Sequence, residues 1–121
     1  MFTLKAFLMS ILYFWRTELP PEAYNLGNSV EIVRYKNGKE VSKYVLDQQN
    51  LKYKSLMKFL MSNRGQWKYD IVSYSPDFLI KGPNITINCR EGNAVVLYKD
   101  INEKSVQLSS DIGSISHCGI E

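Results

Sequence analysis

The dipeptide Asn37-Gly38 constrains the fold of this chain more than any other feature, because it separates two runs of strand-forming residues, 29–36 and 39–46. Both central residues of a type I′ turn need a positive φ, which asparagine and glycine tolerate best. A two-residue loop of this composition therefore predicts a tight hairpin of two antiparallel strands.

The same loop also predicts which residues of the hairpin face each other. Counting outward from the turn gives three facing pairs: Tyr35 with Glu40, Arg34 with Val41, and Val30 with Val45. Apolar side chains then occupy both faces of the hairpin, with Val30, Ile32, Val41 and Val45 on one face and Val33, Tyr35 and Tyr44 on the other. We expect the hairpin to be covered at least partly on each side.

A helix is predicted after the hairpin. Asp47 or Asn50 can cap its first turn, and Gly65 is expected as the C′ residue that ends it. Between these positions the apolar residues recur at helical spacing; they are Tyr53, Leu56, Met57 and Leu60, with Phe59 on the flank. Lys52, Lys54 and Lys58 lie elsewhere, so the outer face of this helix is expected to be basic.

From Trp67 onward the apolar period changes from that of a helix to that of a strand. The strands predicted there cover residues 67–72, 78–81, 85–90, 94–99 and 106–108, with a turn at Gly92-Asn93 and a loose tail over residues 109–121. The short connections favour antiparallel neighbours. The sequence thus predicts one α+β domain over residues 1–121, with an antiparallel sheet of about five to six strands and two helices packed on it.

The second of these helices is predicted at the N-terminus. Residues 6–15 are apolar apart from Ser10, and Pro20-Pro21 stops a helix that we expect within residues 1–19. The run has half of the roughly twenty residues that a spanning helix needs. Three interpretations are open: a core helix in a cytoplasmic protein, an anchor or signal that brings residues 1–16 to a membrane and the chain to the envelope or periplasm, and a helix that binds a partner.

Residues that could carry catalysis are scarce in this sequence. The one histidine, His117, lies in the expected tail, and no glycine pattern for phosphate binding and no Cys-x-x-Cys occurs. Asp70 and Asp77 flank a predicted strand, where carboxylates are usually solvated or capping. Cys89 and Cys118 are either one disulfide or a buried thiol and a tail thiol. We therefore expect no enzyme, no catalytic residues, no cofactor and no metal.

Nucleic acid is an unlikely partner by composition. The chain has 15 basic and 12 acidic residues, a net charge of +3, and its lysines and arginines are spread along the whole sequence. Arg64, Lys68 and the lysines of the predicted helix do lie near Trp67 and Tyr69, as cations and aromatics do in proteins that bind single strands. Both aromatics, however, share a strand face with Ile71 and are expected in the core.

Binding to another protein is the function that remains. Eight tyrosines and two tryptophans are a large share for 121 residues, and such side chains are enriched at interfaces. The candidate partner interface consists of Tyr24, Arg34, Tyr35, Tyr44 and Tyr74.

In its size, architecture and lack of a catalytic set, the chain resembles small bacterial immunity or inhibitor proteins that neutralise a cognate toxin. The resemblance implies a cognate, toxin-like protein partner whose active site is covered. Many inhibitors of nucleases are acidic, whereas this chain is slightly basic, so the target surface need not be strongly basic. The alternatives are a small envelope-associated protein and, third, a module that binds single-stranded nucleic acid.

Overall fold

A seven-stranded sheet forms most of the part of the chain that the computed structural model describes, which is residues 17–21, 23–63, 65–69, 75–111 and 117–120. Its strands are β1 (Ser29–Lys36), β2 (Lys39–Asp47), β3 (Lys68–Tyr69), β4 (Phe78–Lys81), β5 (Ile85–Arg90), β6 (Asn93–Lys99) and β7 (Ser105–Asp111). The helical elements are α2 (Leu51–Ser62) and the short 3-10 turn η1 (His117–Gly119). The molecule is therefore a single α+β domain, mostly β.

The strands follow the order β2-β1-β4-β5-β6-β7-β3, and every pairing between them is antiparallel. The described residues thus hold seven strands where about five to six were expected, and each of the seven overlaps a range that the sequence predicts. They contain one α-helix. Residues 1–16 of the predicted N-terminal helix lie outside the described residues, and Thr17 forms a β-bridge with Trp67.

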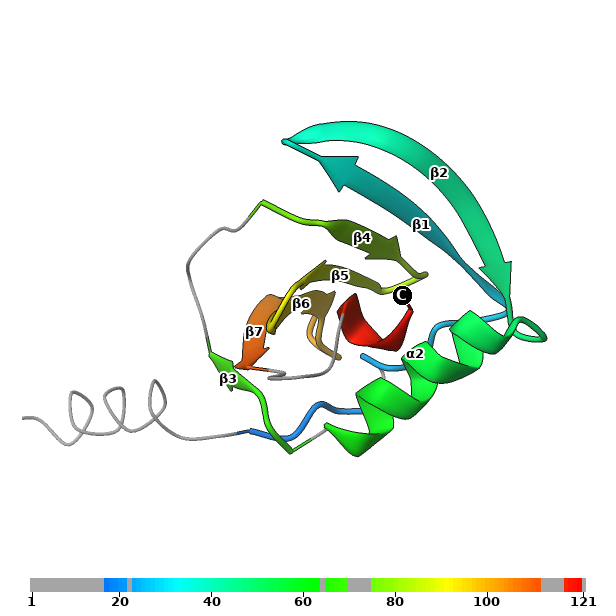
Figure 1. Cartoon of the computed structure of the whole chain (residues 1–121). Coiled ribbons are helices and arrows are strands. Elements are labelled where there is room, and N and C mark those ends of the chain that lie inside the picture. Colours follow the sequence, from blue (N-terminus) through cyan, green and yellow to red (C-terminus); the bar gives the residue numbers. More distant parts are fainter. Residues whose placement is uncertain (1–16, 22, 64, 70–74, 112–116, 121) are drawn as a thin grey trace, which may run out of the picture.

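The core lies on one side of the sheet. Figure 1 shows the strands curling in an arc around η1, with α2 along the open side of that arc. Alternate residues of the strands point inward and are almost completely buried: Val30, Ile32, Ile80, Ile87, Cys89, Val96 and Leu108. They meet Leu56, Phe59 and Leu60 of α2, together with Leu19, Leu26, Trp67 and Ile120 from the connecting segments. Trp67 is fully buried, which confirms its predicted place in the core.

The ends of α2 are set by asparagines. The side chain of Asn50 accepts a hydrogen bond from the Lys52 amide, so Asn50 is the N-cap, one of the two predicted candidates. At the other end, the backbone and side-chain amides of Asn63 both donate to the Phe59 carbonyl. The prediction that Gly65 ends the helix is wrong, because the helix stops at Ser62 and Gly65 does not have a positive φ.

The predicted hairpin is present, but its register differs from the prediction in the half that lies away from the turn. Asn37 and Gly38 have φ values of 53° and 77°, as the turn requires, and Tyr35 faces Glu40 as expected. Beyond that pair the register shifts by one residue, so Arg34 faces Ser42. Val41 is the extra residue of a β-bulge.

The bulge reverses the predicted faces of β2. Val30 pairs with Leu46 instead of Val45, and Ile32 pairs with Tyr44. Leu46 is buried, whereas Val41 and Val45 are 53% and 63% exposed. The prediction that these two valines share the core face with Val30 is therefore wrong, because one inserted residue exchanges inward and outward positions along the rest of the strand.

The segment after residue 108 also differs from its prediction as a loose tail. Ser109 and Ser110 are buried members of β7, which lies between β6 and β3 and is not an edge strand. Residues 112–116 and 121 lie outside the described part. Cys118 and Ile120 are again buried, and η1 contacts α2, β5 and β6. In the described positions this segment therefore contributes to the core.

Candidate protein-binding rim

Three connections meet at one end of the sheet and form a rim around a shallow cavity. They are the β1–β2 turn, the residues before β4, and the β5–β6 turn, which occupies Glu91-Gly92 instead of the predicted Gly92-Asn93. We call this the hairpin rim and define it by the residues that line the cavity: Tyr35, Asn37, Gly38, Ser75, Pro76, Asp77, Arg90 and Glu91. The cavity has a volume of about 350 Å³.

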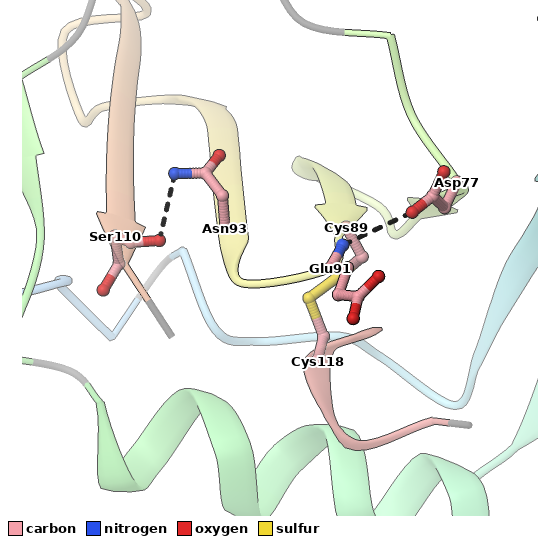
Figure 2. Close-up of a disulfide and its surroundings, with 6 residues drawn as sticks. All are labelled: Asp77, Cys89, Glu91, Asn93, Ser110 and Cys118. Atoms are coloured by element: carbon pink, nitrogen blue, oxygen red, sulfur yellow. Dashed lines mark hydrogen bonds between the residues drawn. A yellow bond between two sulfur atoms is a disulfide. The ribbon is translucent and has the colours of Figure 1, made fainter. Parts of the chain in front are cut away.

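Asp77 fixes the geometry of the hairpin rim. Its carbonyl accepts a hydrogen bond from the Tyr35 amide at 2.8 Å, and its amide donates to the Cys89 carbonyl at 3.1 Å. Its side-chain Oδ2 accepts from the Glu91 amide at 3.3 Å (Figure 2). One residue thus links β1, the end of β5 and the β5–β6 turn, so the backbone of the rim is tied at three points.

The side chains of the hairpin rim combine an aromatic ring with both signs of charge. Tyr35, Asp77 and Arg90 are half-buried there, and Glu91 is exposed. Exposed basic side chains of the hairpin, Arg34, Lys36 and Lys39, lie next to it. Tyrosine and arginine are the side chains that most often dominate the binding energy of protein interfaces.

The structure separates the four described residues of the predicted interface. Arg34 and Tyr35 are neighbours at the rim end of β1, and the alternation of the strand turns them to opposite faces of the sheet. Tyr24 and Tyr44 are half-buried and pack against the core. Tyr74 lies outside the described residues. Of the four described residues, Tyr35 lines the cavity.

Tyr44 has a distinct environment at the start of α2. The ammonium of Lys52 lies 5.9 Å from the centre of its ring, which is cation–π distance. Burial raises the pKa of the Tyr44 hydroxyl, and the positive charge of Arg34 opposes that shift. This tyrosine thus anchors β2 to the helix and the core, a structural role that the sequence reasoning did not assign to it.

Asp77, Arg90 and Glu91 were not expected at a binding site. Arg90 ends a predicted strand, and Asp77 and Glu91 lie directly beside predicted strands, so the sequence does indicate their local structure. Their proximity to Tyr35 depends on the pairing of β1 with β4 and of β4 with β5. The first of these pairings joins segments separated by two strands and a helix, and no local pattern indicates it.

Cys89 and Cys118 form a disulfide, which decides between the two alternatives left by the sequence. Both cysteines are fully buried, and their Cα atoms are 5.9 Å apart. Figure 2 shows the bond beneath the hairpin rim, with Asp77 and Glu91 close to Cys89. The bond ties η1 to the strand end that carries Arg90.

Other observations bear on nucleic-acid binding, on membrane attachment and on metal binding. Trp67 is fully buried in edge contact with Phe59, at 6.4 Å between ring centres, so its ring is not available for stacking on a base. Tyr69, expected in the core, is 42% exposed. In the described ranges no helix is both long and apolar enough to span a membrane. The same residues contain no cluster of three or more histidine, cysteine, aspartate or glutamate side chains that could hold a metal ion.

No family model, curated protein or solved structure matches this chain.

Proposed function

We propose that this protein is a non-enzymatic binding module of the immunity or inhibitor type, which covers the active site of a cognate, toxin-like protein. The observation that carries the proposal is the hairpin rim, where Tyr35 and Arg90 border a cavity of about 350 Å³. A cavity of this size accommodates one large side chain of a partner. The rim around it supplies an aromatic surface, a guanidinium and two carboxylates.

Preorganisation supports the same proposal. The hydrogen bonds of Asp77 hold the rim in one backbone geometry before any partner arrives. A rigid binding surface loses less conformational entropy on association than a mobile loop does. The rim is therefore suited to a tight contact with few anchor residues.

The disulfide favours the second candidate, an envelope-associated protein, because it indicates that the binding activity takes place in an oxidising compartment. Disulfides persist in oxidising compartments and are rare in the cytosol, where thiols are kept reduced. The Cys89–Cys118 bond thus supports a periplasmic or membrane-attached protein over the cytoplasmic one expected first. The two candidates are compatible, because a binding module can act in the envelope. The nucleic-acid hypothesis has less support, since the Trp67 ring is buried.

A binding experiment tests the interface. The oxidised chain is used to capture proteins from the envelope fraction of its host, and the affinity of a stoichiometric partner is measured by calorimetry. We expect Tyr35→Ala and Arg90→Ala each to weaken binding by about 30-fold, the scale of an interface hot spot. Ile101→Ala is the matched control, because Ile101 is 85% exposed in the β6–β7 turn.

The partner should also lose its own activity when one equivalent of this chain is added. The proposal is wrong if no stoichiometric partner is captured, or if the rim variants bind as tightly as the control. Thiol trapping in intact host cells tests the compartment separately. Labelling of both Cys89 and Cys118 as free thiols would show that the native chain is reduced and would exclude the envelope setting.

A further inference from the structure

The chain is fixed to the domain immediately after the N-terminal apolar run, residues 6–15. The Thr17 amide donates a hydrogen bond to the Trp67 carbonyl at 2.6 Å, and these two residues form a β-bridge. Leu19 and Ala23 follow within six residues and are 1% and 0% exposed in the core. All three belong to the packed domain, and a single residue, Arg16, separates the first of them from the apolar run.

This attachment limits where a signal peptidase could remove the apolar run. Such enzymes cut after a small residue that has a second small residue two positions before it. No such pair occurs within residues 1–23, and the nearest approach to one is Pro21 with Ala23. A cut after Ala23 would take away the Thr17 bridge and the buried side chains of Leu19 and Ala23. The structure therefore favours a chain that keeps its apolar run.

Exposed apolar side chains lie close to the point where Thr17 joins the domain. Tyr69, which ends β3, is 42% exposed, and Met61, in the last turn of α2, is 41% exposed. Figure 1 shows the first described residues, in blue, beside β3 and the C-terminal end of α2. Charged groups of both signs are present there, such as Glu18 and Lys68. Apolar contact, more than charge, is what this part of the surface offers to a neighbour.

We propose that this part of the surface lies on a lipid bilayer: residues 1–16 stay on the chain and insert into one leaflet, while Met61 and Tyr69 contact the headgroup region. Ten apolar residues are half the length that a crossing needs, so the run enters the bilayer only from the side on which the domain lies. Tyrosine is enriched at the headgroup level of membranes. The inference rests on the envelope setting of the proposed function and makes no use of the hairpin rim.

Fractionation of host cells, followed by mass spectrometry of the intact chain, tests whether the apolar run is kept. The chain should sediment with the membranes and stay there after a high-salt wash, because apolar burial holds it. Its mass should include the apolar run. A shortened chain, or an intact chain found only in the soluble fraction, would overturn the proposal.

Phosphatidylcholine vesicles and the purified, oxidised full chain test the lipid contact directly. Ile11→Lys should weaken vesicle binding by about tenfold, the effect of losing one buried aliphatic side chain. Ile101→Lys is the matched control and should bind like the unaltered chain, because Ile101 is 85% exposed in the β6–β7 turn. Trp67 is fully buried, so a blue shift of tryptophan fluorescence on adding vesicles should come from Trp15 and vanish in Trp15→Phe. Equal binding of the two lysine variants contradicts insertion of the run.

A fluorophore that senses lipid tests which surface of the domain meets the bilayer. Attached at residue 61 in Met61→Cys it should respond to vesicles, whereas attached at residue 41 in Val41→Cys, on the 53% exposed position of β2, it should not. Equal responses at the two positions would contradict the proposed orientation. Failure to capture a protein partner would leave these results unchanged. Free thiols at Cys89 and Cys118 in host cells would exclude the envelope setting, so each failure can be told from the others.

Discussion

Two adjacent residues of η1 adopt left-handed backbone angles at the point where this turn meets α2. Cys118 has a φ of 59° and Gly119 has a φ of 80°. A Cβ atom built on Gly119 would lie 3.2 Å from the carbonyl oxygen of Ser55 in α2. Gly119 therefore serves two purposes, since it permits the turn and lets the two backbones approach closely.

We expect Gly119→Ala to lower the free energy of unfolding by about 1–2 kcal/mol, the usual penalty of a left-handed residue that carries a Cβ. Urea unfolding of the oxidised protein measures the change. Gly65→Ala is the control, because a Cβ there meets nothing within 4 Å and the φ is not positive. Equal stability of the two variants would show that the close approach of η1 to α2 is not constrained at Gly119.

The raised pKa of Tyr44 predicts that the free energy of unfolding falls as the pH rises above 10. Burial disfavours the ionised form of Tyr44 in the folded state, which raises its pKa above the ordinary value of 10.0. The associated stability is thus complete below pH 10 and is lost as the pH rises through the folded pKa. Tyr44→Phe has no proton to lose, so its stability should fall less between pH 9.5 and 11 in urea unfolding. Identical slopes would mean that the Tyr44 hydroxyl is as solvated in the folded state as in the unfolded state.

At the scale of single elements, the local sequence predicts structure well where one pattern decides it. Asn37-Gly38 indicates the hairpin turn, and the spacing of Tyr53, Leu56 and Leu60 indicates the buried face of α2. The bulge at Val41 is different, because an inserted residue leaves the alternation of each strand intact and changes only how the strands are matched. The exposed valines of β2 could for that reason not be predicted.

The N-cap of α2 supplies a prediction at this scale. Asn50→Ala removes the acceptor for the Lys52 amide and should cost about 1 kcal/mol, which corresponds to a fall in Tm of about 4 °C. Asn50→Asp keeps an acceptor and adds a favourable negative charge at the helix start, so it should unfold near the unaltered Tm. Thermal unfolding followed by circular dichroism gives both values. An alanine variant as stable as the aspartate variant would show that Asn50 contributes nothing as a cap.

At the scale of the whole molecule, the buried face of the sheet could be predicted from the sequence, whereas the contacts between distant segments could not. Alternating apolar residues in β4, β5 and β6 indicate the inner face of the sheet, and those residues are indeed buried. The pairing of β1 with β4 and the return of Cys118 to Cys89 are contacts between distant segments. Each depends on the path of the entire chain, so the hairpin rim, which needs the first of them, could not be assembled from local patterns.

The disulfide is expected to contribute to the stability of the whole domain. It closes a loop with a sequence separation of 29, for which the loss of chain entropy in the unfolded state is worth roughly 3–4 kcal/mol. The double variant Cys89→Ala with Cys118→Ala should lose about that much in urea unfolding. The unaltered protein under reducing conditions is the comparison and should be similarly destabilised. A loss below about 1 kcal/mol would mean that η1 remains docked by packing alone.

The burial of Cys118 and Ile120 among β5, β6 and α2 has a consequence for biosynthesis. Both residues follow every described strand of the sheet in the sequence, so they are synthesised after all of them. Before Cys118 and Ile120 dock, the aliphatic side chains of β5, β6 and α2 that they cover remain exposed to solvent. The core can therefore be completed, and the Cys89–Cys118 bond formed, only after the segment that carries Cys118 and Ile120 has left the ribosome.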